Sequence, residues 1–410
     1  MSRSIRHCLS SPCSTDSPMN EDNPSYYLEN VRIVDPGNSV SSGNALIRNG
    51  RIEALGIIDP AQVDSCERID GQGRLLTPGL IDVHTHGILQ YLYTTSRQDF
   101  LLACSELGQF GTTTILPTIV PQVEPGWFEQ LSEIADAIPE VTSVNVPGLH
   151  LEGPFLAIKG SAAPTLPGDL KLLDEIIAAC RGRMSAMSVS PETPNIIPVI
   201  DRLFENGTKV FLTHTRASPE QTEAAIEAGA THATHFYDVF YAPDEKDPGV
   251  RPVGAVESIL ADQRVSVDFI CDGIHVHPTA IRAAIAAKGS RKVCLITDAV
   301  IGAGLPPDIY DTPWGFQIRV KEGDAPRHAT NGTLSGSGLT MDEGMRNLLK
   351  WIDRPEHEIW GMGSTNPARM LELADTGAMK AGASADLVLW DFDLRVSHTW
   401  VNGRLSFQRE

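Results

Sequence analysis

The stretch "LTPGLIDVHTHG", residues 76–87, contains the first of eight similar strand-like runs along the chain. It joins a Pro-Gly turn to a short apolar segment that ends in two histidines. Runs of this kind alternate with helix-like segments, and they occupy residues 79–84, 112–118, 145–153, 184–190, 209–215, 231–238, 265–273 and 292–299. Eight strands alternating with helices are typical of a (β/α)8 barrel, which needs about 250 residues. An open doubly wound sheet is the alternative, because alternation alone does not prove closure.

The helix-like segments carry their own start and stop signals. Ser218 stands before Pro219, which places a capping residue ahead of a proline at the first helical position. Gly229 and Gly289 follow helical segments where a left-handed C-cap is expected. The segments expected to be helical include residues 97–111, 169–182, 218–230 and 278–289.

Both ends of the chain are rich in β-branched residues and contain hairpin signals. Asn49-Gly50 and Asn402-Gly403 each separate two strand-like runs, and Asn-Gly favours a type I′ turn. We therefore predict an α/β fold: a TIM-like (β/α)8 barrel over residues 77–375, and a small β-sandwich domain from residues 26–76 plus 376–410. Two unrelated edge hairpins are the alternative.

Composition and charge narrow the class of protein. The chain has 410 residues, is 41% hydrophobic and 21% charged, and carries a net charge of −19. These values fit a globular protein with a substantial core, and the negative charge argues against nucleic acid or anionic membrane as a partner. No apolar run is long enough to span a membrane. Seven cysteines without CxxC spacing indicate reduced thiols and a cytoplasmic location.

The first 25 residues have a different character. They are rich in Ser and Pro and lack the apolar core of a secretory signal, so we expect a disordered tail. Met19 offers an alternative start.

Potential metal ligands follow five of the predicted strands. They are His84 and His86, Glu152, His214, His235 and Asp298. The carboxyl ends of barrel strands meet at one mouth, and residues two apart on a strand face the same side. Nitrogen and oxygen ligands of this kind suit Zn²⁺, Fe²⁺ or Mn²⁺. A lone His-x-His has a simpler interpretation as two polar residues at a strand end.

The remaining histidines fit other roles. We expect His150 to lie in the core or to support the ligands, and His232 to be structural. The histidines expected at the surface or in loops are His7, His328, His357 and His398.

A metal in this position predicts hydrolysis. It lowers the pKa of bound water to about 7, which provides hydroxide at neutral pH. Asp298, on the last strand, can take the water's proton and pass it to a leaving group. The alternative for Asp298 is a ligand or a purely structural carboxylate.

The chain resembles the amidohydrolase superfamily and, within it, the N-acetylglucosamine-6-phosphate deacetylases. The resemblance covers nearly the whole chain from about residue 27. The segments that carry it are "LTPGLIDVHTHG", "GTTTILPT", "GLHLEGPF", "AGATHATHFYD", "CDGIHVHP", "LITDA", "NGTLSGSGLTMDEGMRNL" and "SADLVLWD". The His-x-His is common to the superfamily, whereas "HLEGPF", "DGIHVHP" and "NGTLSGSGLTM" are more specific to the deacetylases.

The resemblance implies a set of metal ligands. Glu152, His214 and His235 match the ligands of the main metal, and Glu152 stands where many relatives have a carbamylated lysine. His84 and His86 match a second metal site that some members have lost. One or two divalent ions per chain are therefore expected.

Further roles follow from the same resemblance. Asp298 matches the catalytic acid/base, and His275 matches a residue that contacts the substrate's phosphate. Leu334 and Ser335 match a loop that lines the sugar pocket. The resemblance also implies a homodimer.

The sequence departs from the family in the expected substrate pocket. Ala162 replaces a sugar-contacting histidine, and Asp238 replaces an asparagine. The family arginine that reaches a neighbouring subunit's phosphate is Lys246 here, with Arg251 nearby. Lysine neutralises a phosphate without gripping it through two hydrogen bonds, and a carboxylate at Asp238 repels it.

The sequence thus predicts a metal-dependent hydrolase that removes the N-acetyl group from an amino sugar, such as N-acetylglucosamine 6-phosphate or a close relative. The first alternative is an amidohydrolase for a different N-acyl or cyclic amide substrate. The second is a non-catalytic relative.

Overall fold

The computed structural model describes residues 24–160 and 162–410. The tail expected at the N-terminus, with His7, falls on residues outside this part.

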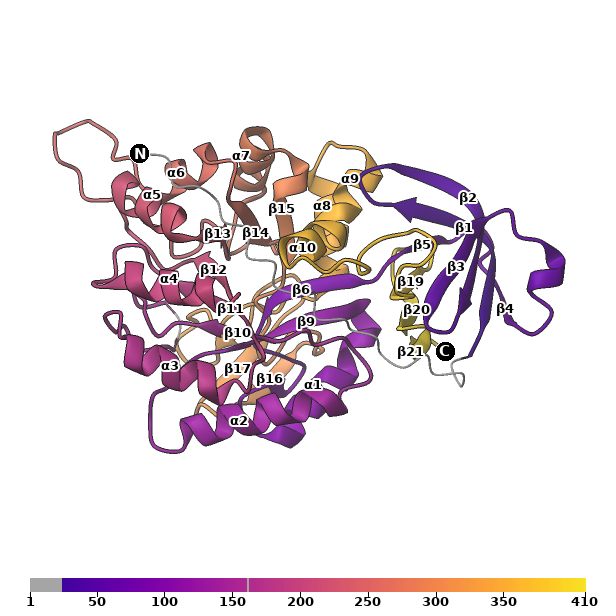
Figure 1. Ribbon diagram of the computed structural model, residues 1–410, viewed down its shortest axis with the longest axis horizontal. Helices are drawn as coiled ribbons and strands as arrows, with labels where there is room; N and C mark the ends of the chain where they lie inside the picture. Colours follow the sequence, from indigo (N-terminus) through magenta and orange to yellow (C-terminus); the bar gives the residue numbers. More distant parts are fainter. Residues whose placement is uncertain (1–23, 161) are drawn as a thin grey trace.

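The central element is a parallel sheet of eight strands, hydrogen-bonded in chain order (Figure 1). Its strands are β6 (Leu80–Thr85), β9 (Thr112–Ile119), β10 (Leu149–Glu152), β11 (Met184–Val189), β12 (Lys209–Leu212), β13 (Ala230–Ala233), β14 (Ser266–Ile270) and β15 (Val293–Ile296). The first and last strands meet just beyond their ends. The backbone N–H of Asp298 donates to the carbonyl of His84 over 2.8 Å, and that of His86 donates to Ala299 over 2.8 Å. The predicted barrel is confirmed, and the open doubly wound alternative is wrong.

Helices cover the outside of the barrel (Figure 1). They are α1 (Arg97–Glu106), α2 (Trp127–Ala137), α3 (Leu170–Ala179), α4 (Ile196–Glu205), α5 (Pro219–Ala228), α6 (Ala255–Ala261), α7 (Pro278–Lys288), α8 (Met341–Trp351), α9 (Glu356–Met362) and α10 (Thr365–Met370). Short 3-10 turns are η1 (Pro60–Gln62), η2 (Leu107–Phe110), η3 (Ile138–Glu140) and η4 (Ser290–Lys292).

The predicted helix signals are confirmed at the start of α5 and are partly wrong at two helix ends. Ser218 forms a capping box with Gln221 at the start of α5. Gly229 and Gly289 follow α5 and α7 with positive φ, at 133° and 78°. Neither has the dihedral pair of a left-handed helical residue, because the chain turns directly into the next segment.

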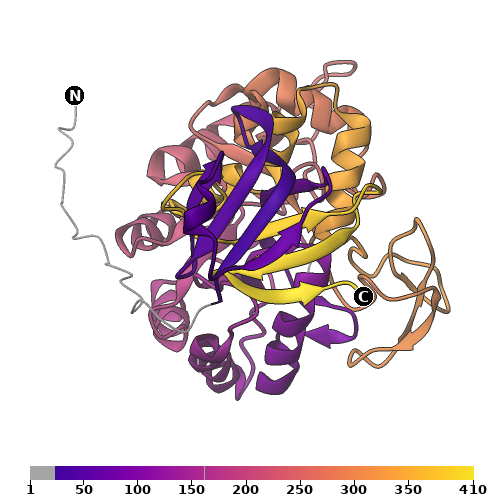
Figure 2. The same cartoon turned by 90° about the vertical axis from the view of Figure 1, so that its right-hand side faces the viewer.

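Both ends of the chain contribute to a second sheet, which packs at one side of the barrel (Figure 2). Its strands are β1 (Tyr26–Asp35), β2 (Ser39–Arg48), β3 (Arg51–Gly56), β4 (Glu67–Asp70), β5 (Leu75–Pro78), β19 (Leu387–Trp390), β20 (Val396–Val401) and β21 (Arg404–Gln408). The strand order is β21-β20-β19-β5-β1-β2-β3, and β4 pairs with β1. Because β19 pairs with β5, the alternative of two unrelated hairpins is wrong.

The terminal sheet has an apolar core of its own, separate from the core of the barrel. The Asn49-Gly50 turn joins β2 to β3, and the Asn402-Gly403 turn joins β20 to β21, with positive φ at all four residues. The two turns lie against each other, since a Cβ added to Gly403 would lie 2.8 Å from the Cα of Gly50. Apolar side chains from both chain ends, such as Tyr26, Ile47, Leu387 and Trp400, pack together in one buried cluster.

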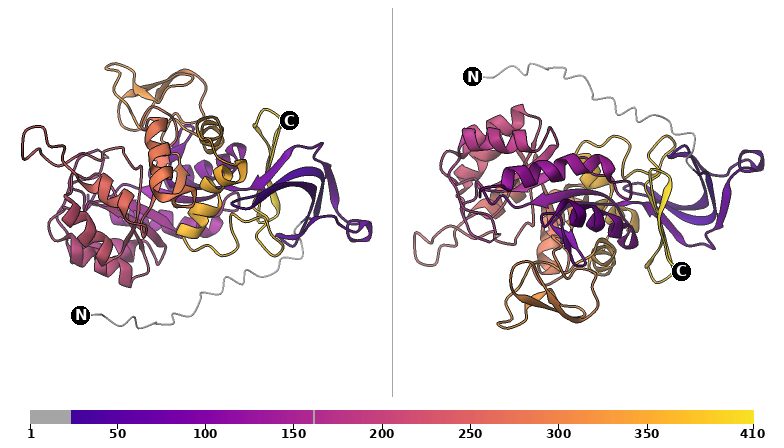
Figure 3. Two further views of the ribbon diagram at one scale, coloured as in Figure 1. Left: turned by 90° about the horizontal axis from the view of Figure 1, so that it is seen from above. Right: turned by 90° about the horizontal axis from the view of Figure 1, so that it is seen from below.

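Two smaller sheets were not predicted. One is a two-stranded hairpin of β7 (Gly87–Ile88) and β8 (Tyr91–Leu92). The other, here called the inserted sheet, consists of β16 (Asp308–Asp311), β17 (Gln317–Val320) and β18 (Arg327–His328). It follows β15 and projects from the barrel as a separate lobe (Figures 2 and 3). Within the described residues, no helix is long and apolar enough to cross a membrane.

Candidate active site

The six predicted ligand and acid/base residues converge at the carboxyl ends of the barrel strands. Glu152, at the end of β10, lies at the centre of the group. Its Oε1 is 2.9 Å from Nε2 of His214 and 3.2 Å from Nε2 of His235. Its Oε2 is 3.5 Å from Nε2 of His86. The carboxylate therefore faces imidazole nitrogens from three other strands.

Asp298 closes the other side of the group. Its Oδ1 is 3.2 Å from Nε2 of His86 and 3.4 Å from Nε2 of His84. The two Nε2 atoms are themselves 3.3 Å apart. His84 and His86 thus point to the same side, as their spacing on one strand predicted, and both face a second carboxylate besides Glu152.

The other ring nitrogen of three histidines is held by a partner. Nδ1 of His86 donates to the carbonyl of Thr118 over 3.2 Å, and Nδ1 of His235 donates to the carbonyl of Asp238 over 3.3 Å. Nδ1 of His84 is 2.9 Å from the hydroxyl of Thr234. A proton held on Nδ1 leaves the Nε2 lone pair directed into the group, which is the arrangement of a metal-binding histidine.

Three of these strand ends contain residues in a strained backbone conformation. His214, His235 and Asp298 have φ values of 46°, 35° and 50°. Such left-handed conformations are uncommon for residues other than glycine and cost about 1–3 kcal/mol each. They turn the chain sharply after β12, β13 and β15, so that these three side chains point into the barrel mouth.

The charges in the group favour an ionised carboxylate among imidazoles. Burial alone would raise the pKa of Glu152, but hydrogen bonds from His214 and His235 hold that pKa well below its usual range. Burial likewise opposes a charge on His235, and contact with Glu152 outweighs it and raises the pKa to about 10. Burial lowers the pKa of His84 well below its usual range.

The geometry fits divalent metal ions. His84, His86 and Glu152 form one group of three, and Glu152, His214 and His235 form another, with the ligand atoms in each group within 4.8 Å of one another. Both groups offer imidazole nitrogen and carboxylate oxygen, which suit Zn²⁺, Fe²⁺ and Mn²⁺. A bound metal would take the place of protons that these side chains otherwise share.

Two buried aspartates support the ligands from behind, and the sequence analysis missed both. Asp268 on β14 accepts the backbone N–H of His235 over 2.5 Å and lies 2.7 Å from Nε2 of His232. Asp82 on β6 accepts the backbone N–H of His84 over 3.3 Å. Asp82 stands two residues before His84 in the same strand, and that spacing is the signal that could have identified it. Asp268 comes from a neighbouring strand, and no local pattern marks it.

The two groups of potential metal ligands open into a cavity of about 780 Å³. Asp238 and Leu334 line it, as the resemblance implied. His275, Lys246 and Arg251 are absent from its lining. Lys246 and Arg251 lie on an exposed loop, where Arg251 pairs with Glu257 at 2.5 Å.

His275 is absent from this lining, and it is bonded to a carboxylate partner of its own. Its Nδ1 is 2.5 Å from Oδ2 of Asp272. Burial would lower the pKa of His275, and the bond to Asp272 outweighs that effect and raises it. A contact between His275 and a substrate phosphate stays a prediction.

The cavity contains aromatic residues that the sequence analysis did not identify as site residues. They are Trp127, Trp314, Phe316 and His328. His328 was expected at the surface or in a loop, whereas it lies on β18 and faces the cavity. His398, placed in the same class, is buried in β20.

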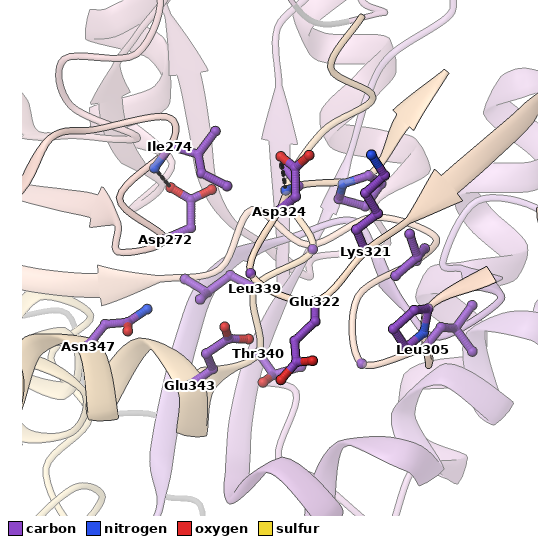
Figure 4. Close-up of a pocket in the computed structure, with 18 residues that line it drawn as sticks. Asp272, Ile274, Leu305, Lys321, Glu322, Asp324, Leu339, Thr340, Glu343 and Asn347 are labelled. Atoms are coloured by element: carbon purple, nitrogen blue, oxygen red, sulfur yellow. Dashed lines mark hydrogen bonds between the residues drawn. The ribbon is translucent and has the colours of Figure 1, made fainter. Parts of the chain in front are cut away.

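A second cavity, of about 360 Å³, lies between the inserted sheet and α8 (Figure 4). Carboxylates dominate its charged lining: Asp272, Glu322, Asp324 and Glu343, with Lys321. Asp272 accepts the backbone N–H of Ile274 there, over 2.8 Å.

Comparisons with known proteins agree with this geometry. The family model of the amidohydrolase family matches residues 75–406. An N-acetylglucosamine-6-phosphate deacetylase of Lysinibacillus sphaericus is 30% identical over 94% of this chain and 98% of its own. An N-acetylgalactosamine-6-phosphate deacetylase of Escherichia coli O157:H7 is 31% identical over 86% of this chain and 92% of its own.

Solved structures of deacetylases are also similar to this chain over nearly its whole length. A mutant N-acetyl-D-glucosamine-6-phosphate deacetylase of Mycobacterium smegmatis, solved with N-acetyl-D-glucosamine 6-phosphate, superimposes with a TM-score of 0.82. It is 26% identical, and the match covers 94% of this chain and all of that one.

Proposed function

This chain belongs to the amidohydrolase family, and on that premise we propose that it removes the N-acetyl group from an amino sugar, N-acetylglucosamine 6-phosphate or a close relative. The convergence of Glu152 with imidazoles from three other strands is the observation that carries the proposal. The relatives with the matching names cover nearly the whole chain, which supports the same reaction class.

The metal ligands are assigned by their grouping. Glu152, His214 and His235 would hold the main ion, as the family resemblance implies, and His84 and His86 would complete a second site together with Glu152. The site takes one or two ions per chain, drawn from Zn²⁺, Fe²⁺ and Mn²⁺. When bound, such an ion activates water and polarises the amide carbonyl.

Asp298 moves the proton. Its side chain reaches the cavity next to His86, so it can accept the proton of the attacking water. As water oxygen bonds to the carbonyl carbon and the C–N bond breaks, the same carboxyl returns a proton to the leaving nitrogen. The products are acetate and the free amine.

We propose that the protein is a cytoplasmic homodimer. The loop between β13 and α6 projects from the barrel (Figure 1) and exposes Tyr241, Val250 and Val253, an apolar set suited to a second copy. The described cysteines are all free, which supports a reducing compartment. Sedimentation analysis of the purified chain tests the dimer, and a monomer at micromolar concentration contradicts it.

Release of acetate tests the reaction. N-acetylglucosamine, N-acetylgalactosamine and their 6-phosphates are compared side by side with the metal-loaded enzyme. We expect acetate from at least one of the four. If none of them releases acetate while an unrelated N-acyl or cyclic amide is hydrolysed, the amino-sugar assignment is wrong.

A further inference from the structure

One wall of the active-site cavity is a stack of three aromatic rings, here called the aromatic shelf: Trp314, Phe316 and His328. The rings of Trp314 and Phe316 are 5.6 Å apart and inclined by 28°, and those of Phe316 and His328 are 4.6 Å apart and inclined by 21°. All three residues line the cavity that also contains Glu152 and Asp298. The shelf therefore faces the same space as the reacting amide.

The shelf is supported from behind by a hydrogen bond and by apolar packing. The hydroxyl of Thr312 donates to the carbonyl of Phe316 over 2.6 Å and closes the turn that carries Trp314. Phe316 packs against a small apolar cluster under the inserted sheet, which includes Leu92 and Ile318. Trp314 nevertheless remains 42% exposed. A large, fixed apolar ring left open at the edge of a cavity is suited to stacking with a ligand.

The charged groups that this chain itself contributes to the cavity lining are carboxylates. Across the described residues, no lysine or arginine lines the cavity, whereas Glu152, Asp238 and Asp298 all do. Much of the remaining lining is apolar, including Val300 and Leu334. Within one chain the lining offers a phosphate no guanidinium or ammonium group, so such a partner would have to come from a second copy, whereas the aromatic faces of the shelf suit an uncharged ring.

The size of the cavity points the same way. Pockets for drug-sized ligands measure about 300–1,000 Å³, and this one measures about 780 Å³. A single sugar ring fills only part of such a volume. The space beside the shelf can accept a further ring of the substrate.

We propose that the aromatic shelf binds an uncharged ring carried by the substrate in addition to its N-acetylated sugar. The preferred substrates are then N-acetylamino sugars substituted with a second sugar or an aryl group. This inference rests on the proposed deacetylase function and specifies its substrate class.

Acetate release from four sugars tests the inference with the metal-loaded full chain. They are N-acetylglucosamine, its 6-phosphate, its 4-nitrophenyl β-glycoside and N,N′-diacetylchitobiose. We expect kcat/KM for at least one of the last two to exceed that of N-acetylglucosamine by tenfold or more. Comparing the aryl glycoside with the disaccharide shows which kind of ring the shelf prefers.

Variants locate the effect on the shelf. We divide kcat/KM for the ring-substituted sugar by kcat/KM for free N-acetylglucosamine. Trp314→Ala should lower this ratio to threefold or less, and Trp314→Phe should keep most of the ratio of the unaltered enzyme. Phe392→Ala is the matched control, because Phe392 is an exposed aromatic residue outside the cavity lining. Its ratio should equal that of the unaltered enzyme.

The outcomes separate the two proposals. The shelf inference is wrong, and the deacetylase function stands, if acetate is released but kcat/KM for the ring-substituted sugars is within threefold of that for N-acetylglucosamine. The same holds if the unaltered enzyme shows a larger ratio and Trp314→Ala leaves that ratio unchanged. A hundredfold preference for the 6-phosphate over both ring-substituted sugars also overturns the shelf inference alone. No acetate from any of the four overturns the shelf inference, and the deacetylase function is overturned as well only if N-acetylgalactosamine and its 6-phosphate also release none.

Discussion

Asp298 is the residue whose chemistry is easiest to isolate. We expect Asp298→Asn to lower kcat by about 10²- to 10⁴-fold, because an amide cannot accept the proton of the attacking water. The fold should survive, since Asp298 has φ of 50° and asparagine tolerates the left-handed region. Acetate release, thermal unfolding and metal content measured on the same preparation check this. Near-normal turnover would remove Asp298 from its assigned role.

His84 and His86 test the second metal site. We expect the double variant His84→Asn, His86→Asn to bind one fewer ion per chain than the unaltered protein, because Glu152, His214 and His235 still form their own group. Metal content is measured by elemental analysis after dialysis.

His277→Asn is the control for that experiment. His277 is an exposed histidine that caps α7 by accepting the backbone N–H of Thr279, a position where asparagine is also favoured. An unchanged metal count in the double variant would mean that the His-x-His pair supports the site without binding an ion.

At the scale of elements, β14 holds the end of β13 in place. Asp268 on β14 bonds to the backbone N–H of His235 and pairs with His232. We expect Asp268→Asn to weaken metal binding at the Glu152, His214 and His235 group by about 10- to 100-fold, because supporting partners of ligands typically contribute this much. Titration with Zn²⁺ measures the affinity.

A milder variant keeps the β14 test informative if Asp268→Asn does not fold. Ser266→Ala removes only the hydroxyl that lies 2.7 Å from Nδ1 of His232, so a smaller loss of affinity is expected. A fall in melting temperature with unchanged metal affinity in both variants would show that Asp268 supports the barrel and not the ligand.

The capping box of α5 gives a prediction about stability alone. Ser218→Ala removes the side-chain acceptor for the backbone N–H of Gln221, and we expect a loss of about 1 kcal/mol in the free energy of unfolding. Because Ser218 is absent from the cavity lining, kcat/KM should not change. Urea unfolding and acetate release measure the two quantities. A tenfold loss of activity at unchanged stability would contradict this assignment.

At the scale of the whole molecule, metal binding and folding should be linked. The ligands come from four strands that are far apart in sequence, so the folded barrel is what brings them together. An ion present at about 100 times its Kd stabilises the folded state by about 2.7 kcal/mol. We expect a chelator to lower the melting temperature by several degrees and added Zn²⁺ to restore it.

The control for the chelator experiment removes the main site. In His214→Asn, His235→Asn the melting temperature should respond much less to the chelator. An equal response in that variant would place the stabilising ion elsewhere.

The sequence alone determined the barrel, the terminal sheet and the group of potential metal ligands. Periodic strand and helix patterns predict local structure, and the Asn-Gly pairs at 49–50 and 402–403 define their hairpin turns locally. His84, Glu152, His214 and Asp298 could be assigned to one site because barrel strands all present their carboxyl ends to the same mouth. Once the fold class is known, the position of a residue at a strand end is enough to place it.

Only the tertiary structure decided which residues line the cavity. The strands of the inserted sheet are two to four residues long and form no clear pattern, so the sequence did not reveal that Trp314 and His328 face the catalytic group. The tertiary structure also places Lys246 and Arg251 on an exposed loop, outside the lining of the cavity. The direction of a loop or small lobe depends on packing between segments distant in sequence, and local patterns carry no record of that packing.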